Sequence, residues 1–192
     1  MQRKSLMLTN KKISSLSGCS PVLPDNPQYN TLRKLADEYN LIPVNVAGDG
    51  NCFFHAVSAA LRYIDFDVPL GDELKMEIID FLSLAESRDN YSDAVEISDD
   101  SLNLFNGDYD KAKHYEYDAF LERLRFDPNE FADNVAVQAT VDMLHITIKV
   151  FDSANPRHPM VIQPRDDFSQ TSITLGNKNQ EHYIAMLPII FT

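Results

Sequence analysis

A glycine-rich turn that runs directly into an apolar helix constrains the fold most. Residues 46–61 read VAGDGNCFFHAVSAAL, so two glycines in a polar turn precede apolar residues at helical spacing. Alternating Ile42, Val44 and Val46 predict a short strand that leads into the turn. One apolar stripe after the turn predicts a buried helix that begins near Cys52: Phe53, Ala56, Val57, Ala60, Leu61 and Ile64. A buried helix joined to a strand needs a packed domain around it.

The other expected elements place helices early and strands late in the chain. Helical spacing predicts further helices over residues 26–40, 71–87, 117–125 and 134–144, with a polar and irregular insertion over 90–118. Strands are expected over 145–152, 160–164, 171–175 and 182–187, the last two joined by the hairpin loop GNKNQE. This order predicts an α+β domain whose small, mostly antiparallel sheet is covered by helices.

Length and cysteine content limit the class of protein. At 192 residues the chain is long enough for one domain with a full core, expected over residues 25–192. Two cysteines, Cys19 and Cys52, can form neither a disulfide framework nor a four-ligand zinc site, which predicts an intracellular protein without a metal. Residues 1–24 hold four basic residues and no acid, which predicts a flexible leader, or alternatively an organelle-targeting peptide. No apolar run reaches membrane-spanning length, so no membrane contact is expected.

The net charge of −12 is concentrated in the middle of the chain. Residues 65–130 contain 19 acidic and 6 basic side chains, so the flanks are close to neutral. Such a surface repels phosphate backbones, which argues against nucleic-acid binding and favours a partner with a basic face. The simpler alternative is that these acids only keep the domain soluble.

Cys52 has the surroundings of a nucleophile. It follows the turn at the first helical position, where unpaired backbone N–H groups converge and the helix dipole is positive, which favours a thiolate. The N–H groups of Gly50, Asn51 and Cys52 could bind a developing oxyanion. The alternative is a small buried cysteine behind an Asp or Asn helix cap. Among five histidines we expect His182 to be the base, because it opens the last strand and its ring can project from the sheet edge.

Three stretches carry a resemblance to a known family. GDGNCFFHAVSAAL resembles the nucleophile signature of the OTU (ovarian tumour) cysteine proteases, and EHYIAML resembles their terminal strand with histidine and an aromatic residue. Between them, FADNVAVQATVDMLHITIKVFD resembles the family's helix-then-strand segment. The resemblance covers residues 42–188 and implies the papain-like OTU cysteine protease fold. It also implies a deubiquitinase that needs no cofactor and acts on ubiquitin, polyubiquitin or a ubiquitin-like protein.

The resemblance assigns chemical roles to residues of this chain. It implies that the Cys52 thiolate attacks the carbonyl of the modifier's C-terminal glycine, and that His182 protonates the departing lysine amine and then activates water. The glycines that end ubiquitin lack side chains, so the channel for its tail can be narrow, and Tyr183 is a candidate wall.

One position departs from the family pattern. Many members carry Asp or Asn two residues after the histidine, where it orients the imidazole, but here that residue is Ile184, which cannot accept the ring N–H. We expect Asp49 to orient the ring instead, because some members use an acid from the nucleophile loop. The alternatives are Asn177 or Asn179 in the hairpin loop, a backbone carbonyl, or water. Asp49 could also serve only as a helix cap or loop brace.

Other functions remain open at this point. The domain could be a ubiquitin-binding module with weak catalysis or none, an OTU-like protease of a ubiquitin-like or polyprotein substrate, or a thiol-dependent transferase. We expect a monomer in the cytoplasm. A small OTU domain with an unusual leader fits a eukaryotic cytosolic enzyme, and it also fits a secreted pathogen effector that acts in a host cytosol.

Overall fold

The computed structural model describes residues 11–128, 130–166, 169–179 and 181–189. Its elements are, in chain order, α2 (Pro27–Glu38), β1 (Leu41–Val44), α3 (Cys52–Tyr63), α4 (Gly71–Leu82), α5 (Ala85–Tyr91), the 3-10 turn η1 (Ser92–Ala94), α6 (Asp99–Leu104), α7 (Tyr109–Phe126), α8 (Asn134–Leu144), β2 (Ile146–Asp152), β3 (Met160–Ile162), β4 (Thr171–Lys178) and β5 (His182–Pro188). Helices come early and four of these five strands come late, so the predicted α+β class is confirmed. No helix in the described part of the chain is both long and apolar enough to cross a membrane.

The five strands form one sheet in the order β1-β5-β4-β2-β3. Neighbouring strands are antiparallel except β2 and β4, which run parallel. The small, mostly antiparallel sheet is therefore confirmed, with one parallel pair. β4 extends through Gly176 to Lys178, so the loop before β5 is residues 179–181 and is shorter than the predicted six residues. The short loop fixes the register that pairs Lys178 with His182.

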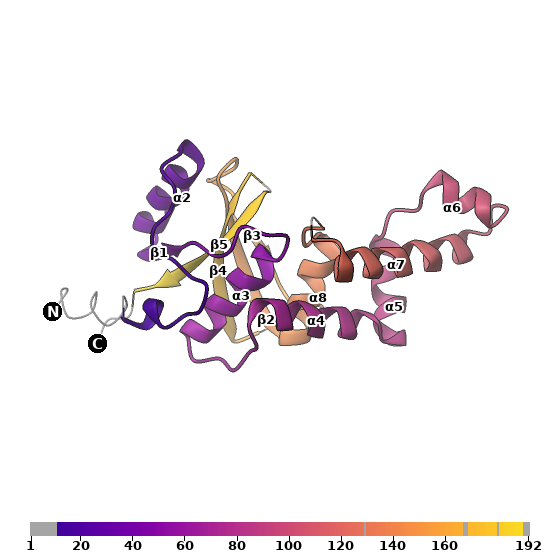
Figure 1. Cartoon of the computed structure of the whole chain (residues 1–192), viewed down its shortest axis with the longest axis horizontal. Helices are drawn as coiled ribbons and strands as arrows, with labels where there is room; N and C mark the ends of the chain where they lie inside the picture. Colours follow the sequence, from indigo (N-terminus) through magenta and orange to yellow (C-terminus); the bar gives the residue numbers. More distant parts are fainter. Residues whose placement is uncertain (1–10, 129, 167–168, 180, 190–192) are drawn as a thin grey trace.

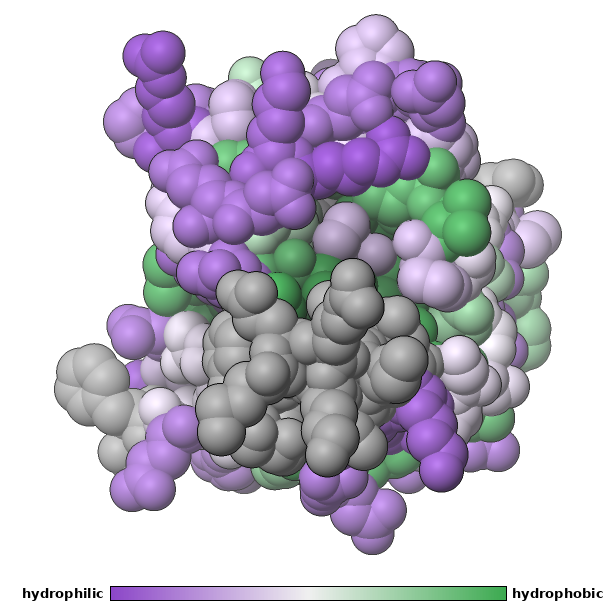
Figure 2. All heavy atoms as spheres, turned by 90° about the vertical axis from the view of Figure 1, so that its left-hand side faces the viewer, coloured by the Kyte–Doolittle hydropathy of each residue, from purple (hydrophilic) through white to green (hydrophobic). Residues whose placement is uncertain are grey.

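Helices cover both faces of the sheet (Figure 1). Successive residues of β5 alternate between two buried clusters, as the pleat of a strand requires. Ala185 and Leu187 pack in the larger cluster with α3, α4 and α8, while Ile184 and Met186 pack in a smaller cluster with α2. The far side of α2 is polar, and hydrophilic side chains cover the upper part of the molecule in Figure 2. The stripe that follows the glycine turn lies in the larger cluster as its spacing predicts, except Ile64, which caps the end of α3 and is 39% exposed.

An arm of helices, formed by α5, η1, α6 and α7, projects from this core at the right of Figure 1. The insertion over residues 90–118 was predicted to be irregular, but it forms the end of α5, η1, α6 and the first half of α7. Ser98 caps α6 and Asp108 caps α7 with their side chains, so local capping helps to set these helices. The prediction was wrong because the buried residues of α7 are concentrated toward its second half, which leaves no apolar stripe over the first turns.

The packed domain begins before residue 25, in contrast to the prediction. Ile13 and Leu16 are buried in the larger cluster and Leu23 is buried against α2. The backbones of Ser20 and Asn45 exchange two hydrogen bonds of 2.9 and 2.7 Å, which ties this segment to the chain just after β1. Residues 1–10 of the expected leader lie outside the described residues.

Candidate active site

The loop over residues 48–52, the nucleophile loop, is held in shape by hydrogen bonds to Asp49. The carboxylate of Asp49 accepts the backbone N–H of Asn51 at 2.9 Å, and its carbonyl accepts the N–H of Cys52 at 3.2 Å. Gly50 lies so close to the carbonyl of Pro128 that a Cβ would approach its oxygen to 2.2 Å, so only glycine fits there. The loop ends at Cys52, which is the first residue of α3 and is 2% exposed.

The structure brings Cys52 and the His182 segment together from 130 positions apart. The backbone N–H of Tyr183 donates to Cys52 Sγ at 3.5 Å, so the start of β5 contacts the nucleophile. His182, 8% exposed, opens β5 as predicted, and its ring lies beside Gly48 of the nucleophile loop. The start of α3 therefore faces the start of β5, with a thiol on one element and an imidazole on the other.

The ring of His182 is oriented by Asn45, which the sequence analysis missed. Nε2 of His182 lies 3.0 Å from Oδ1 of Asn45, and an amide oxygen can only accept. In a neutral ring Nε2 therefore carries the proton, and Nδ1 is left with its lone pair free to accept one. Asn45 lies between the buried Val44 and Val46, so in an extended segment its side chain points to the opposite face. A polar residue between two buried valines was the available signal.

The residues that were predicted to orient the ring have other partners. The carboxylate of Asp49 binds the backbone N–H of Asn51 and also lies 3.3 Å from Nε2 of His55, so Asp49 is a loop brace. Asn179 takes a left-handed conformation, and its N–H donates to Ser153 Oγ at 3.1 Å. Asn177 is buried and its side chain hydrogen bonds with that of Tyr183. The choice of Asp49 is thus corrected to Asn45.

Ile184 has a packing reason to be apolar. It is fully buried in the cluster that joins β5 to α2, against Leu32 and Met186. Gly176 on β4 lies so close that a Cβ there would come within 2.9 Å of Ile184 Cγ1. An asparagine at this position would bury a polar amide among apolar side chains. The acceptor for His182 is supplied from the segment beside β1 instead.

The predicted set of oxyanion donors needs one correction. The N–H of Asn51 is used by the carboxylate of Asp49, in the local turn that Asp side chains commonly make with the backbone two residues on. The N–H of Cys52 makes a longer bond to the carbonyl of Asp49 at 3.2 Å. In this conformation neither the N–H of Asn51 nor that of Cys52 is a free donor, because Asp49 accepts both.

Burial is the main cause of the pKa shifts of Cys52 and His182. It raises the pKa of the Cys52 thiol, against the lowering effect of hydrogen bonds from the backbone of Tyr183 and Phe53. Burial and the nearby Lys178 lower the pKa of His182, against the charge of Asp49. Both directions favour the neutral thiol and imidazole over the ion pair. This direction differs from the resting thiolate that the helix start predicts, because burial disfavours the charged form.

A groove of about 520 Å³ opens beside the sulfur. Cys52, Phe53 and Tyr183 line its inner wall, with the rings of Phe53 and Tyr183 edge to face at 5.2 Å. Three acidic residues are also part of its lining, Asp133, Asp152 and Glu181. In the described part of the chain, no three His, Cys, Asp or Glu side chains are grouped to hold a metal ion.

Comparison with known proteins supports the fold that this site occupies. No protein-family model and no curated protein matches the sequence. Among solved structures, the OTU domain of OTUD1 is 19% identical with a TM-score of 0.60, over 83% of this chain and 94% of that one. An OTU deubiquitinase from Wolbachia pipientis wMel is 12% identical with a TM-score of 0.61, over 78% and 89%. The Hazara virus OTU bound to ubiquitin is 17% identical with a TM-score of 0.50, over 82% and 86%.

The chain therefore has the OTU fold, as the sequence resemblance implied. The α+β architecture and the mixed five-stranded sheet match these structures. At 12 to 19% identity the comparisons define the fold, and the chemistry is argued from the site itself.

Proposed function

We propose that this protein is a cysteine-type deubiquitinase, which hydrolyses the isopeptide bond after the C-terminal glycine of ubiquitin through a Cys52 thioester. The observation that carries the proposal is the meeting of Cys52 with the start of β5, where Asn45 holds the ring of His182. The Wolbachia OTU deubiquitinase and the Hazara virus OTU bound to ubiquitin, which share this fold, support the choice of substrate.

The mechanism follows from the neutral resting pair. As Sγ of Cys52 attacks the carbonyl carbon, its proton moves to Nδ1 of His182, and the carbonyl oxygen becomes an oxyanion beside the Asp49–Cys52 loop. The tetrahedral intermediate collapses, and His182 donates that proton to the departing lysine amine. Water then attacks the thioester while His182 accepts its proton, which releases the ubiquitin carboxylate and restores the thiol.

The groove suits a chain end without bulky side chains. Tyr183 and Phe53 hold their rings against each other beside the sulfur, so both side chains restrict the space near the reacting carbon. A tail of glycines meets this restriction without a clash, whereas a branched residue next to the scissile bond does not. We assign Tyr183 to the wall of this channel on that ground.

The arm supplies the acidic surface that a basic modifier would contact. Five of the six basic residues in 65–130 form ion pairs with acids of the same stretch: Arg88, Lys111, Lys113, Arg123 and Arg125. The sixth, Lys75, is buried. The acidic excess of the stretch therefore remains on the surface, which favours a partner with a basic face.

Salt is expected to raise KM for ubiquitin substrates more than it lowers kcat. Between 0.1 and 1 M salt the screening length falls from about 10 to about 3 Å, which weakens attraction by exposed charges. A fluorogenic ubiquitin amide measures both constants. Asp99→Asn with Asp100→Asn on α6 should weaken this dependence, while the control Asp37→Asn with Glu38→Gln on α2 should not. A KM that salt leaves unchanged would remove the arm from substrate binding.

The proposed function is tested by a ubiquitin probe with a C-terminal electrophile. We expect the wild type to form a covalent adduct and to cleave diubiquitin, and we expect Cys52→Ala to do neither. Cys19→Ser, at the other cysteine, is the matched control and should react like the wild type. Absence of both labelling and cleavage in the wild type would refute the proposal. Ubiquitin binding without labelling would then favour the binding-module alternative.

A further inference from the structure

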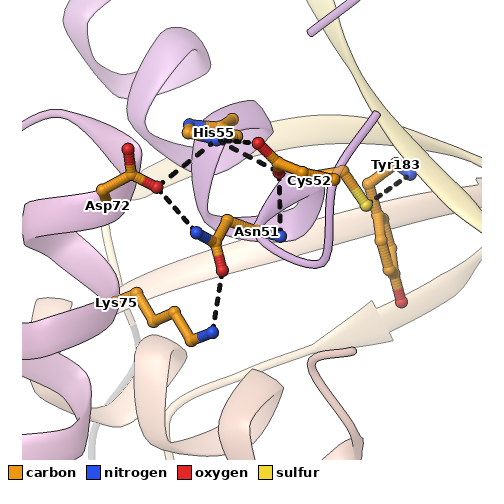
Figure 3. Close-up of polar contacts among 7 residues, drawn as sticks. Asn51, Cys52, His55, Asp72, Lys75 and Tyr183 are labelled. Carbon is orange, nitrogen blue, oxygen red and sulfur yellow. Dashed lines mark hydrogen bonds and ion pairs between the residues drawn. The ribbon is translucent and has the colours of Figure 1, made fainter. Parts of the chain in front are cut away.

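Lys75 is a buried cation next to the nucleophile loop, and the mechanism above does not use it. It lies on α4, is 5% exposed, and donates from Nζ to Oδ1 of Asn51 at 2.8 Å (Figure 3). Asn51 directly precedes Cys52. Removing an ammonium group from water is costly, so a buried lysine at this place calls for a compensating role.

Two residues of α4 contact the side-chain amide of Asn51, one at its nitrogen and one at its oxygen. While Lys75 binds its oxygen, Nδ2 of the same amide donates to Oδ1 of Asp72 at 2.7 Å. An ammonium can only donate and a carboxylate can only accept, so the two partners fix the amide in one orientation. Asp72 and Lys75 are three residues apart on α4, which places them on one face of the helix. Asn51 is therefore held by two opposite charges.

The backbone of Asn51 is held from the other side. Its N–H donates to Asp49 at 2.9 Å, and the carboxylate of Asp49 lies 3.3 Å from Nε2 of His55, one turn into α3. Gly71, at the start of α4, is so close to His55 that a Cβ would lie 2.2 Å from Nδ1. The helices α3 and α4 therefore meet at closest approach beside the loop, and Asn51 joins them.

We propose that Lys75 is a positioning residue, which acts through Asn51 to hold the nucleophile loop in the conformation that presents Cys52 to the substrate carbonyl. The inference rests on the proposed function for its effect on catalysis. Burial lowers the pKa of Lys75, and the charges of Asp72, Asp49, Glu130 and Asp127 offset part of this effect. The Lys75 ammonium contacts Asn51, the residue before Cys52, and in this proposal His182 is the group that exchanges protons with the sulfur.

Lys75→Met tests this role, because methionine keeps the apolar stem and removes the donor. We expect kcat for a fluorogenic ubiquitin amide to fall about 10- to 100-fold with KM within about two-fold, since small displacements of reacting groups have effects of this size. The melting temperature should change little or fall slightly, because the Asn51 amide oxygen loses its donor while a buried charge is removed. Lys75→Gln, which keeps an N–H donor, should lie between. Lys34→Met on the exposed face of α2 is the control and should match the wild type.

Hydrogen exchange at the Asn51 amide gives a readout that needs no activity. We expect the backbone N–H of Asn51 to exchange about 10-fold faster in Lys75→Met than in the wild type. This corresponds to a loss of about 1.4 kcal/mol in the free energy of local opening. The inference would be overturned by an unchanged exchange rate or by an unchanged kcat. It would also be overturned if kcat fell only in proportion to the fraction of protein that no longer reacts with the probe. If the wild type cleaves no ubiquitin conjugate, the proposed function fails and the exchange rate alone decides whether Lys75 holds the loop.

Discussion

His182→Ala is expected to lower kcat/KM for ubiquitin substrates by at least about 10³-fold, because removal of the base from a nucleophile–base pair has effects of this order. The reason is specific to this site. Burial raises the pKa of Cys52, which favours the thiol, so attack on the carbonyl depends on a group that takes the proton. The measurement is hydrolysis of a fluorogenic ubiquitin amide. His145→Ala, at an exposed histidine that caps the end of α8 and does not line the groove, is the control for loss of an imidazole.

The same charge states set the pH dependence of the wild type. His182 must be neutral to accept the proton, and its pKa is lowered, so the ring stays neutral to more acid pH than an ordinary histidine. Half of the maximal kcat on the acid side should therefore be reached below pH 6.5, about the ordinary value for histidine. In the Cys19→Ser background, alkylation of Cys52 by iodoacetamide should rise with pH, with a midpoint above about 8.5. Fast alkylation that is independent of pH between about 5 and 8 would show a resting ion pair instead.

Periodicity predicted most of the elements that form the site. The glycine turn with its apolar stripe gave α3, alternating residues gave β1 and β2, and β5 was expected as a short strand. These signals are local, since burial of one face leaves a fixed spacing in the chain. The arm had no such signal, because its helices are short or polar along most of their length and depend on the caps Ser98 and Asp108. The parallel pairing of β2 with β4 is a matter of topology, which spacing does not record.

The site residues divide in the same way. Cys52 and His182 follow from local signals, a helix start and a strand start, and the fold brings their elements together. Asn45 carries no motif, and its role depends on the lateral pairing of β1 with β5. The pKa of Cys52 depends on how deeply the helix terminus is buried, which composition does not give. Lys75 meets Asn51 because α3 and α4 pack closely at Gly71, again a tertiary feature.

Asn45→Ala is expected to lower kcat about 10- to 100-fold with little change in KM, as loss of a partner that orients a functional histidine commonly does. Without the amide oxygen, Nε2 of His182 has no fixed acceptor in this position, so the ring loses both its tautomer and its orientation. Asn45→Asp keeps an acceptor and adds a negative charge that stabilises the imidazolium. That variant should retain activity and move the acid limb of the kcat profile to higher pH, because the pKa of His182 rises.

Asp49→Asn separates this assignment from the sequence-based one. An asparagine at position 49 keeps a side-chain oxygen for the N–H of Asn51 and removes the carboxylate charge. If Asn45 orients the ring, Asp49→Asn should change kcat by less than Asn45→Ala does. The melting temperatures of both variants are compared first, so that each kcat refers to folded protein. A near-normal kcat in Asn45→Ala, together with a large loss in Asp49→Asn, would return the orienting role to Asp49 and refute the geometry on which the proposed mechanism depends.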